Sequence, residues 1–280
     1  MVRTSFLRRD ILDSYGNRIL GTEIYRDSKD VETPEGFLRD PEGYLERTVG
    51  QLRTTTIYET DRSTIFKIRI GNRELFVKRM NVPTNIQMYH DMSGLERMEG
   101  VVERGENEIF TSSRVSTESE VRTSAEVILS GVKHHLYPGF YIFMTRYPPG
   151  IFMDDFLLST EHLSSQPDEI RERLLLPLAE TMTKIHGCVV EGGRVHHDLH
   201  PGNIYLTRPK IKKNPYGIIV LDWENSDYKE PIKKLNEGTR KRELQRFIEA
   251  RERGSCKASL SDREFDALIG IYWKIVNQEM

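Results

Sequence analysis

The order of the sequence patterns along the chain is the feature that most constrains its fold. Residues 51–80 contain three runs rich in Thr, Ile, Phe and Val, with the segment GNRE between the second and the third. Short runs of this composition around a turn predict three antiparallel strands. The C-terminal segments RKRELQRFIEARERG and LSDREFDALIGIYWKIVN instead repeat their apolar residues at helical spacing. Strands followed by helices predict an α+β chain with two unequal lobes.

The middle of the chain predicts a mixture of elements. Helix-forming residues before Gly131 predict a helix over 117–131, after a polar insertion at 81–117. The run GFYIFMTRY predicts a strand, which the following Pro-Pro-Gly would end. Apolar residues at helical spacing predict a helix over 168–187, with a kink or break near Pro177. The remaining predictions are a strand pair at 204–206 and 218–221, a helix cap at Ser261, and an extension or helical cap over residues 1–50.

Size, charge and cysteine content limit the class of protein. At 280 residues the chain is long enough for one large domain or two modest lobes. Its 41 basic and 43 acidic residues give a formal charge of -2, so no overall field attracts an anionic partner and no nucleic acid is expected. Cys188 and Cys256 are too few for a disulfide framework and fit a reducing cytoplasm. The chain has no run of about 18 apolar residues, which disfavours a membrane span.

Two basic runs are candidates for a local docking surface. They are RPKIKK, residues 208–213, and the segment KKLNEGTRKR. Charge runs of this kind are more often solvated faces, and docking of an anionic partner such as a phosphorylated glycolipid is the alternative. The expected location is therefore the cytoplasm, with peripheral contact at the inner face of a membrane left open. Nothing in the sequence indicates an oligomeric state.

The segment VHHDLHPGNIYL, residues 195–206, carries the most chemical information. It places His196, Asp198 and Asn203 at fixed spacing on a loop between a helix and a short strand. The apolar run GIIVLDWENS then delivers Asp222 at the end of a strand. Phosphoryl transfer requires magnesium, positive charge and a positioned acceptor for the proton of the nucleophile. Asp198 would accept that proton, while Asn203 and Asp222 would supply the oxygen ligands that magnesium prefers.

The two motifs HxDLHPGN and LDWE resemble the catalytic loop and the metal motif of the protein-kinase-like superfamily. The resemblance is to the branch that holds aminoglycoside and choline phosphotransferases, lipopolysaccharide core sugar kinases and Bud-type small kinases. It extends from about residue 51 to the end of the chain. It implies a bilobal fold with an N-terminal extension at 1–50, a small antiparallel-sheet N-lobe at 51–145 and a mainly helical C-lobe at 146–280. The implied cofactors are ATP and magnesium.

The resemblance also implies a lysine and an acid that handle the nucleotide. Lys78, in FVKRM, matches the strand lysine that contacts the α and β phosphates. Without the downstream motifs, a lysine on a strand would more often be a solvated charge. The carboxylate partner of Lys78 is expected on the following helix at Glu120, with Glu118 and Glu126 as alternatives.

The phosphate-covering turn departs from the superfamily pattern. It is expected at residues 60–64, where ETDRST contains no glycine. Backbone amides and the hydroxyls of Ser63 and Thr64 would then reach the phosphate oxygens. An ordinary hairpin turn is the alternative interpretation.

The segment MTRYPPG, residues 144–150, resembles the adenine-binding hinge between the lobes. Hinges of this kind bind adenine through backbone groups, and Pro148 has no N–H to donate. The backbone contacts are therefore assigned to Arg146 and Tyr147. A buried strand end is a competing explanation that is compatible with both residues.

The histidines of the catalytic loop have more than one interpretation. His196 resembles the histidine that braces the loop backbone in this superfamily, rather than one that reacts. His200 would approach substrate or phosphate, or would brace the loop. The cluster at 196–200 also raises a zinc site as an alternative, because imidazole is a good zinc ligand. The DLHPGN context favours the kinase interpretation.

The phosphoryl acceptor is the least constrained part of the function. After Asp222 the chain runs DWENSDYKEPIKK toward a helix, without the long activation loop that eukaryotic protein kinases use to hold a peptide. This favours transfer of the γ-phosphate to a hydroxyl of a sugar, glycolipid or other small molecule. The alternatives are a compact Ser/Thr kinase or ATPase of the Bud type, and a pseudokinase that serves as a nucleotide-binding scaffold.

Overall fold

The chain divides into two compact units, each of which buries its own apolar side chains. Unit 1 comprises Met1–Ile109 and Val127–Arg146, and unit 2 comprises Phe110–Glu126 and Tyr147–Met280. The structure is a computed structural model, and it describes residues 5–12, 18–26, 56–60, 62–70, 73–81, 94–118, 121–123, 128–134, 139–145, 147–159, 171–187, 196–208, 215–226 and 236–279.

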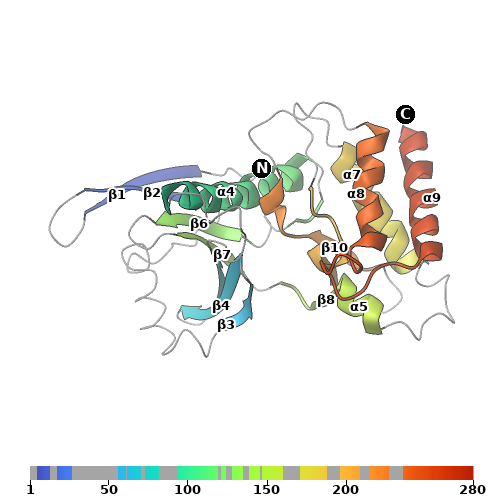
Figure 1. The fold of residues 1–280 in the computed structure, drawn as a ribbon, viewed down its shortest axis with the longest axis horizontal. Helices are drawn as coiled ribbons and strands as arrows, with labels where there is room; N and C mark the ends of the chain where they lie inside the picture. The colour runs from blue at the N-terminus through green and yellow to red at the C-terminus, as the bar shows by residue number, and fades with distance from the viewer. Residues whose placement is uncertain are drawn as a thin grey trace. The chain divides into compact units, whose positions relative to one another are not determined.

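A seven-stranded antiparallel sheet forms most of the described part of unit 1 (Figure 1). Its strands lie in the order β1 (Ser5–Leu12), β2 (Arg18–Arg26), β6 (Ile128–His134), β7 (Gly139–Thr145), β5 (Arg73–Met80), β4 (Ser63–Ile70) and β3 (Thr56–Glu59). The three strands predicted within 51–80 are confirmed, and so is the strand over GFYIFMT. Strands β1 and β2 belong to the same sheet, whereas the sequence predicted an extension or a helical cap there.

The central strands β5 and β7 contribute most to the core of unit 1. They are paired in a register that sets Val77 opposite Phe143 and Lys78 opposite Ile142. Val77 and Ile142 are fully buried. Lys78 is only 9% exposed, because it lies on a central strand. A lysine with so little access to water is unusual, which distinguishes Lys78 from the solvated strand lysine of the alternative interpretation.

Helix α4 (Gly94–Glu118) corrects the prediction for the segment after β5. The sequence predicted a polar insertion over 81–117 and a helix over 117–131, but the helix occupies much of that insertion and residues 128–134 form β6. Gly105 of α4 is a packing glycine, because a Cβ there would lie 2.8 Å from Phe140 Cε1 and closer still to two other ring carbons. Close contact between helix and sheet, rather than a turn, therefore explains this glycine.

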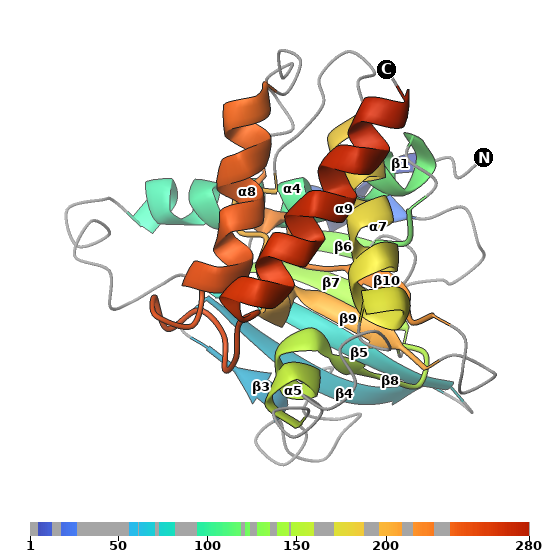
Figure 2. The ribbon, with the colours of Figure 1, turned by 90° about the vertical axis from the view of Figure 1, so that its right-hand side faces the viewer.

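Unit 2 packs helices against a three-stranded antiparallel sheet (Figure 2). The sheet has the order β10 (Gly217–Val220), β9 (Ile204–Thr207) and β8 (Gly150–Phe152), and the helices are α5 (Met153–Ser159), α7 (Leu176–Gly187), α8 (Glu237–Glu249) and α9 (Asp262–Glu279). Leu178, Leu206, Phe247 and Leu268 are fully buried and join these elements in one core. The predicted strand pair and the two C-terminal helices are confirmed. No helix within the described ranges is both long and apolar enough to cross a lipid bilayer.

Two local predictions for the helices of unit 2 are also confirmed. A π-helical turn, Arg171–Leu175, precedes α7, and Pro177 is the second residue of α7. Proline lacks an N–H and so interrupts the backbone hydrogen bonds of a helix. The change from the π-helical turn to α7 lies next to Pro177 for this reason. Ser261 caps α9: the Glu264 N–H donates to Ser261 Oγ at 3.4 Å, and the Glu264 carboxylate accepts the Ser261 N–H at 2.8 Å. This reciprocal pair is a capping box.

Candidate active site

The catalytic-loop segment predicted from HHDLHPGN is folded by its own histidines. His196 is fully buried, and its Nε2–H donates to the Leu221 carbonyl at 2.7 Å. Its other ring nitrogen, Nδ1, accepts the Asp198 N–H at 3.3 Å. His197, between them, has a φ of 64°, in the left-handed region that is uncommon for residues other than glycine. The strained residue next to Asp198 shows that the loop conformation is imposed by its surroundings.

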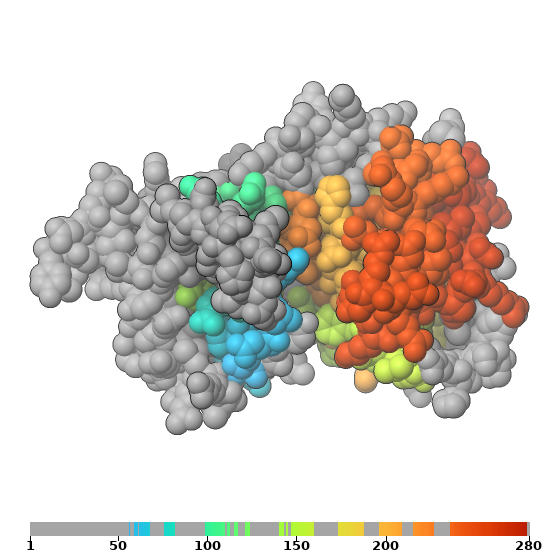
Figure 3. Space-filling view, in the orientation of Figure 1, coloured from blue at the N-terminus to red at the C-terminus, as the bar shows by residue number. Residues whose placement is uncertain are grey.

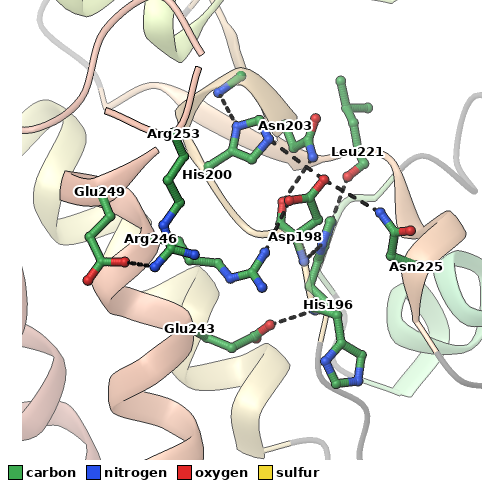
Figure 4. A network of polar contacts seen from close by, with 12 residues as sticks. His196, Asp198, His200, Asn203, Leu221, Asn225, Glu243, Arg246, Glu249 and Arg253 are labelled. Carbon is green, nitrogen blue, oxygen red and sulfur yellow. Dashed lines mark hydrogen bonds and ion pairs between the residues drawn. The ribbon is translucent and has the colours of Figure 1, made fainter. Parts of the chain in front are cut away.

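Asp222 follows β10 and lies beside the loop that carries His196 and Asp198. The Leu221 N–H donates to the Asn203 carbonyl at 2.9 Å, while the Leu221 carbonyl accepts from His196. Leu221 is therefore hydrogen-bonded to both ends of the 196–203 loop, and Figure 4 shows its carbonyl beside His196. Asp222 follows with a φ of 64°, the second non-glycine residue with positive φ in the described chain. These bonds bring Asp198, Asn203 and Asp222 together on one scaffold within unit 2.

Trp223 fixes this arrangement from the side of the core. It is fully buried, and its ring centroid lies 4.5 Å from that of His196. The packing holds His196 in the orientation that its two backbone bonds require. His196 thus occupies a bracing position with no access to solvent, and the structure gives it no route to a substrate.

The Asp198 carboxylate is surrounded by three polar side chains. Arg246 Nη1, from α8, lies 3.1 Å from Oδ1. On the other oxygen, Oδ2, the Asn225 amide lies at 3.5 Å and His200 Nε2 at 3.8 Å. The Asp198 side chain remains 31% exposed, so the carboxylate is accessible to a small molecule in solvent.

His200 serves the loop rather than lying free in it. It is the N-terminal cap of a short 3₁₀-helix, Pro201–Asn203, and its Nδ1 accepts the Gly202 N–H at 3.1 Å. Burial lowers the pKa of His200, and the charges of Asp198 and Asp222 oppose that effect without reversing it. His200 is therefore neutral at pH 7, with the proton on the Nε2 that faces Asp198.

Glu243, which was not predicted as a site residue, stabilises the loop by accepting one of its backbone N–H groups. It is 3% exposed, and its Oε1 accepts the backbone N–H of His197 at 2.8 Å. Its Oε2 lies 3.2 Å from His186 Nε2, and the Tyr272 hydroxyl lies 2.9 Å from His186 Nδ1. Burial raises the pKa of Glu243, but the hydrogen bond and charge of His186 outweigh burial, so the pKa is lowered overall. The sequence did contain a sign that Glu243 is buried: it lies four residues before Phe247, on the apolar face of α8, where an acid is unusual.

The donor set suits a magnesium ion held mainly by a nucleotide. Asn203 Nδ2 donates to the Asp198 carbonyl at 2.9 Å, which leaves the Oδ1 of that amide to face away from the bond. With the Asp222 carboxylate, this gives two hard oxygen ligands from the protein, the number that magnesium commonly takes beside phosphates and water. Within the described residues, no group of three or more His, Cys, Asp or Glu side chains is arranged to hold a metal.

Three of the predicted nucleotide residues, Lys78, Ser63 and Thr64, lie in unit 1. Ser63 and Thr64 begin β4 and are buried, and Thr64 Oγ1 accepts from Asn81 Nδ2 at 2.8 Å. The turn before them is closed by Thr60, whose Oγ1 accepts the Ser63 N–H at 3.0 Å. A threonine therefore makes the turn in which the superfamily pattern has glycine. Glu120 and Arg146, as well as the alternative Glu126, lie outside the described residues.

Tyr147 takes part in an aromatic cluster of unit 2. Its ring centroid lies 5.1 Å from that of Tyr205, and Tyr205 in turn lies 5.3 Å from Phe152. The Tyr205 hydroxyl donates to the Pro148 carbonyl at 2.9 Å, and the Arg208 N–H donates to the Pro149 carbonyl at 2.8 Å. The Pro148 and Pro149 carbonyls are thus occupied within unit 2. Tyr205, two residues after Asn203, was not predicted as a site residue.

Comparison with known proteins gives a likeness in structure alone. No protein-family model matches the chain, and no curated protein matches it. A solved structure of WaaP in complex with acyl carrier protein is similar, with a TM-score of 0.53 and 15% sequence identity over 87% of this chain and 88% of that chain. The chain has an α+β protein-kinase-like fold. The fold class predicted from the sequence is confirmed.

Proposed function

We propose that this chain is an ATP- and magnesium-dependent phosphotransferase that acts on a hydroxyl of a sugar, glycolipid or other small molecule. One observation carries the proposal: Leu221 is bonded at its N–H to Asn203 and at its carbonyl to His196. This connection fixes Asp222 beside the loop that carries Asp198. A proton acceptor and two magnesium ligands on one scaffold are what phosphoryl transfer requires of a protein.

The roles follow from the surroundings of each group. Asp198 accepts or orients the proton of the acceptor hydroxyl, since its carboxylate is accessible and its neighbours are donors. Asn203 Oδ1 and Asp222 would hold magnesium when the nucleotide is bound, and the chemistry supplied there would be neutralisation of charge on the phosphates. His196 positions the loop and takes no part in proton transfer.

Lys78 is proposed as the phosphate-binding cation, with Glu108 in place of Glu120 as its carboxylate partner. The helix that follows β5 is α4, and Glu120 comes after its end. Among the α4 acids whose side chains are described, Glu108 alone is buried, at 3% exposure. Arg104, one turn earlier, donates to the Asn81 carbonyl just beyond β5 at 2.7 Å, which places this part of α4 against the strand of Lys78. A buried acid and a buried lysine in one unit would stabilise each other's charge.

Tyr147 and Tyr205 are proposed to bound the adenine site. The carbonyls of Pro148 and Pro149 are already bonded, so backbone recognition of adenine falls to the residues before them. The half-buried ring of Tyr205 lies next to Tyr147 and offers a surface on which a base would stack. Ser63 is the proposed hydroxyl contact to phosphate, since the Thr64 oxygen already accepts from Asn81.

A magnesium-dependent thermal shift with ATP, followed by measurement of ADP release with pools of sugars and glycolipids, tests the proposal. Asp198→Asn is expected to lower turnover by about 100- to 10,000-fold and to retain Mg·ATP binding. Asp155→Asn is the matched control, because Asp155 is a surface acid of the same unit bonded to Lys257. Binding without turnover that depends on Asp198 would favour the scaffold alternative. Turnover with the protein itself as acceptor would favour a protein kinase.

A further inference from the structure

Arg246 forms the one bond between Asp198 and a permanently charged group in the described part of unit 2. Its Nη1 lies 3.1 Å from Asp198 Oδ1, and the two side chains are 33% and 31% exposed (Figure 4). Ion pairs with this much solvent access contribute little to stability, because water competes for both charges. Arg246 can therefore exchange its bond to Asp198 for a bond to a ligand at a small cost in free energy.

The other neighbours of Asp198 carry no permanent charge. Asn225 is an amide, and the imidazole of His200 has Nδ1 committed to the Gly202 N–H. Permanent positive charge at the acceptor side of the proposed site is consequently supplied from α8. The cation beside Asp198 thus comes from a helix and not from the loop that carries Asp198.

The acids of α8 do not offset Arg246. Glu237 is paired with Lys241, Glu243 is buried against His186, and Glu249 is bonded to Arg253. Figure 3 shows the outer side of α8 at the molecular surface. An anion that approaches Asp198 along α8 would thus meet Arg246 with its guanidinium directed at the reacting carboxylate.

We propose that Arg246 binds an anionic substituent of the acceptor, so that the substrate class is a sugar or glycolipid with a phosphate or carboxylate near the reacting hydroxyl. The inference rests on the proposed function. The planar guanidinium binds either anion through two parallel hydrogen bonds. When such an acceptor arrives, Arg246 transfers its bond from Asp198 to the anion, which frees Oδ1 for the hydroxyl proton. Cationic acceptors such as aminoglycosides are disfavoured by the same charge.

Calorimetric binding of glucose, glucose 6-phosphate and glucuronate to the full chain tests this directly, without and with Mg·ADP. Wild-type protein is expected to bind both anionic sugars at least 10-fold more tightly than glucose. Arg246→Gln should remove that difference. Arg246→Lys should keep part of it, since lysine provides the charge without the two parallel N–H donors of the guanidinium. Arg242→Gln is the matched control, because Arg242 lies on α8 and its bonds within the described residues are to Gly238 and Thr239 of its own helix.

Asp198→Asn separates ligand binding from a purely structural brace. Removal of the competing carboxylate should tighten binding of glucose 6-phosphate several-fold, and the gain should disappear in the Asp198→Asn, Arg246→Gln double variant. Equal binding of all three sugars by the wild type would overturn the inference. So would an Arg246→Gln variant that loses affinity for Mg·ATP as much as for glucose 6-phosphate, because the anion would then be the nucleotide. Absence of Mg·ADP binding would instead reject the proposed function, since the sugars are also measured without nucleotide.

Discussion

Glu243 accepts the backbone N–H of His197, the residue with positive φ that precedes Asp198, at 2.8 Å. The same carboxylate is 3.2 Å from His186 Nε2, so one buried acid joins the 196–203 loop, α7 and α8. A left-handed histidine persists only where its surroundings compensate for the strain. The Glu243 bond is the compensation that the described structure shows for His197.

Removal of Glu243 should therefore destabilise unit 2 strongly. Glu243→Leu leaves the His197 N–H and the His186 ring buried without their acceptor. Loss of one partner of a buried pair costs about 3–5 kcal/mol, and that loss is expected here. Trp223 and Trp273 are the two tryptophans of the chain and both belong to unit 2, so urea unfolding followed by tryptophan fluorescence reports on this unit. Glu249→Gln, which alters a solvent-accessible pair on the same helix, should change stability by about 0.5 kcal/mol or less.

The acid stability of unit 2 should depend on the same residue. The pKa of Glu243 is lower in the folded chain than its ordinary value of 4.5, so the unfolded chain binds the proton more tightly. The stabilisation is present above pH 4.5 and is lost as the pH falls through the folded pKa. Glu243→Gln cannot take up this proton, and its free energy of unfolding should vary less with pH below 4.5 than that of the wild type. Identical slopes in fluorescence-detected unfolding would contradict the assignment.

At alkaline pH the neighbouring tyrosine should control stability. Burial raises the pKa of Tyr272 to about 12, from an ordinary value of 10.0, against the opposing charge of Arg240. The folded chain therefore holds this proton more tightly than the unfolded chain, and stability is present below pH 10 and falls as the pH rises toward 12. Tyr272→Phe should show a shallower decline in this range, at the expense of the hydrogen bond to His186 at every pH. Parallel curves for wild type and variant would show that Tyr272 does not titrate in this way.

The local geometry of the candidate site was predictable because its parts are close in sequence. Asp198 and Asn203 are five residues apart on one loop, and Asp222 ends a strand whose apolar residues are evident from the sequence. Arg246 and Glu243 were not predictable in this way. They meet the loop across 48 and 46 residues of chain, and that contact depends on how α8 packs in the core. A helix pattern shows which face is buried, but it does not show which loop that face touches.

The fold prediction was wrong where local residue type and tertiary packing give opposite signals. Residues 128–134 form a strand in the middle of the sheet, between β2 and β7, although the segment before Gly131 contains helix-forming residues. Pairing on both sides overrides a weak helix propensity. The converse holds for α4, a helix of 25 residues in a segment that the sequence predicted as a polar insertion.

The two α4 glycines provide a matched pair of substitutions within unit 1. At Gly105 a new Cβ would collide with the Phe140 ring, which is fully buried and cannot withdraw, so Gly105→Ala should destabilise the protein by about 1–3 kcal/mol. At Gly100 no atom of the described residues, apart from its chain neighbours and its own helix backbone, lies within 4 Å of the new Cβ, so Gly100→Ala should stabilise by about 0.5–1 kcal/mol through helix propensity alone. Thermal unfolding followed by circular dichroism compares the two, and Phe140→Leu should recover part of the loss in the Gly105→Ala background. A gain in stability for both alanine variants would mean that α4 does not pack on β7 at Gly105.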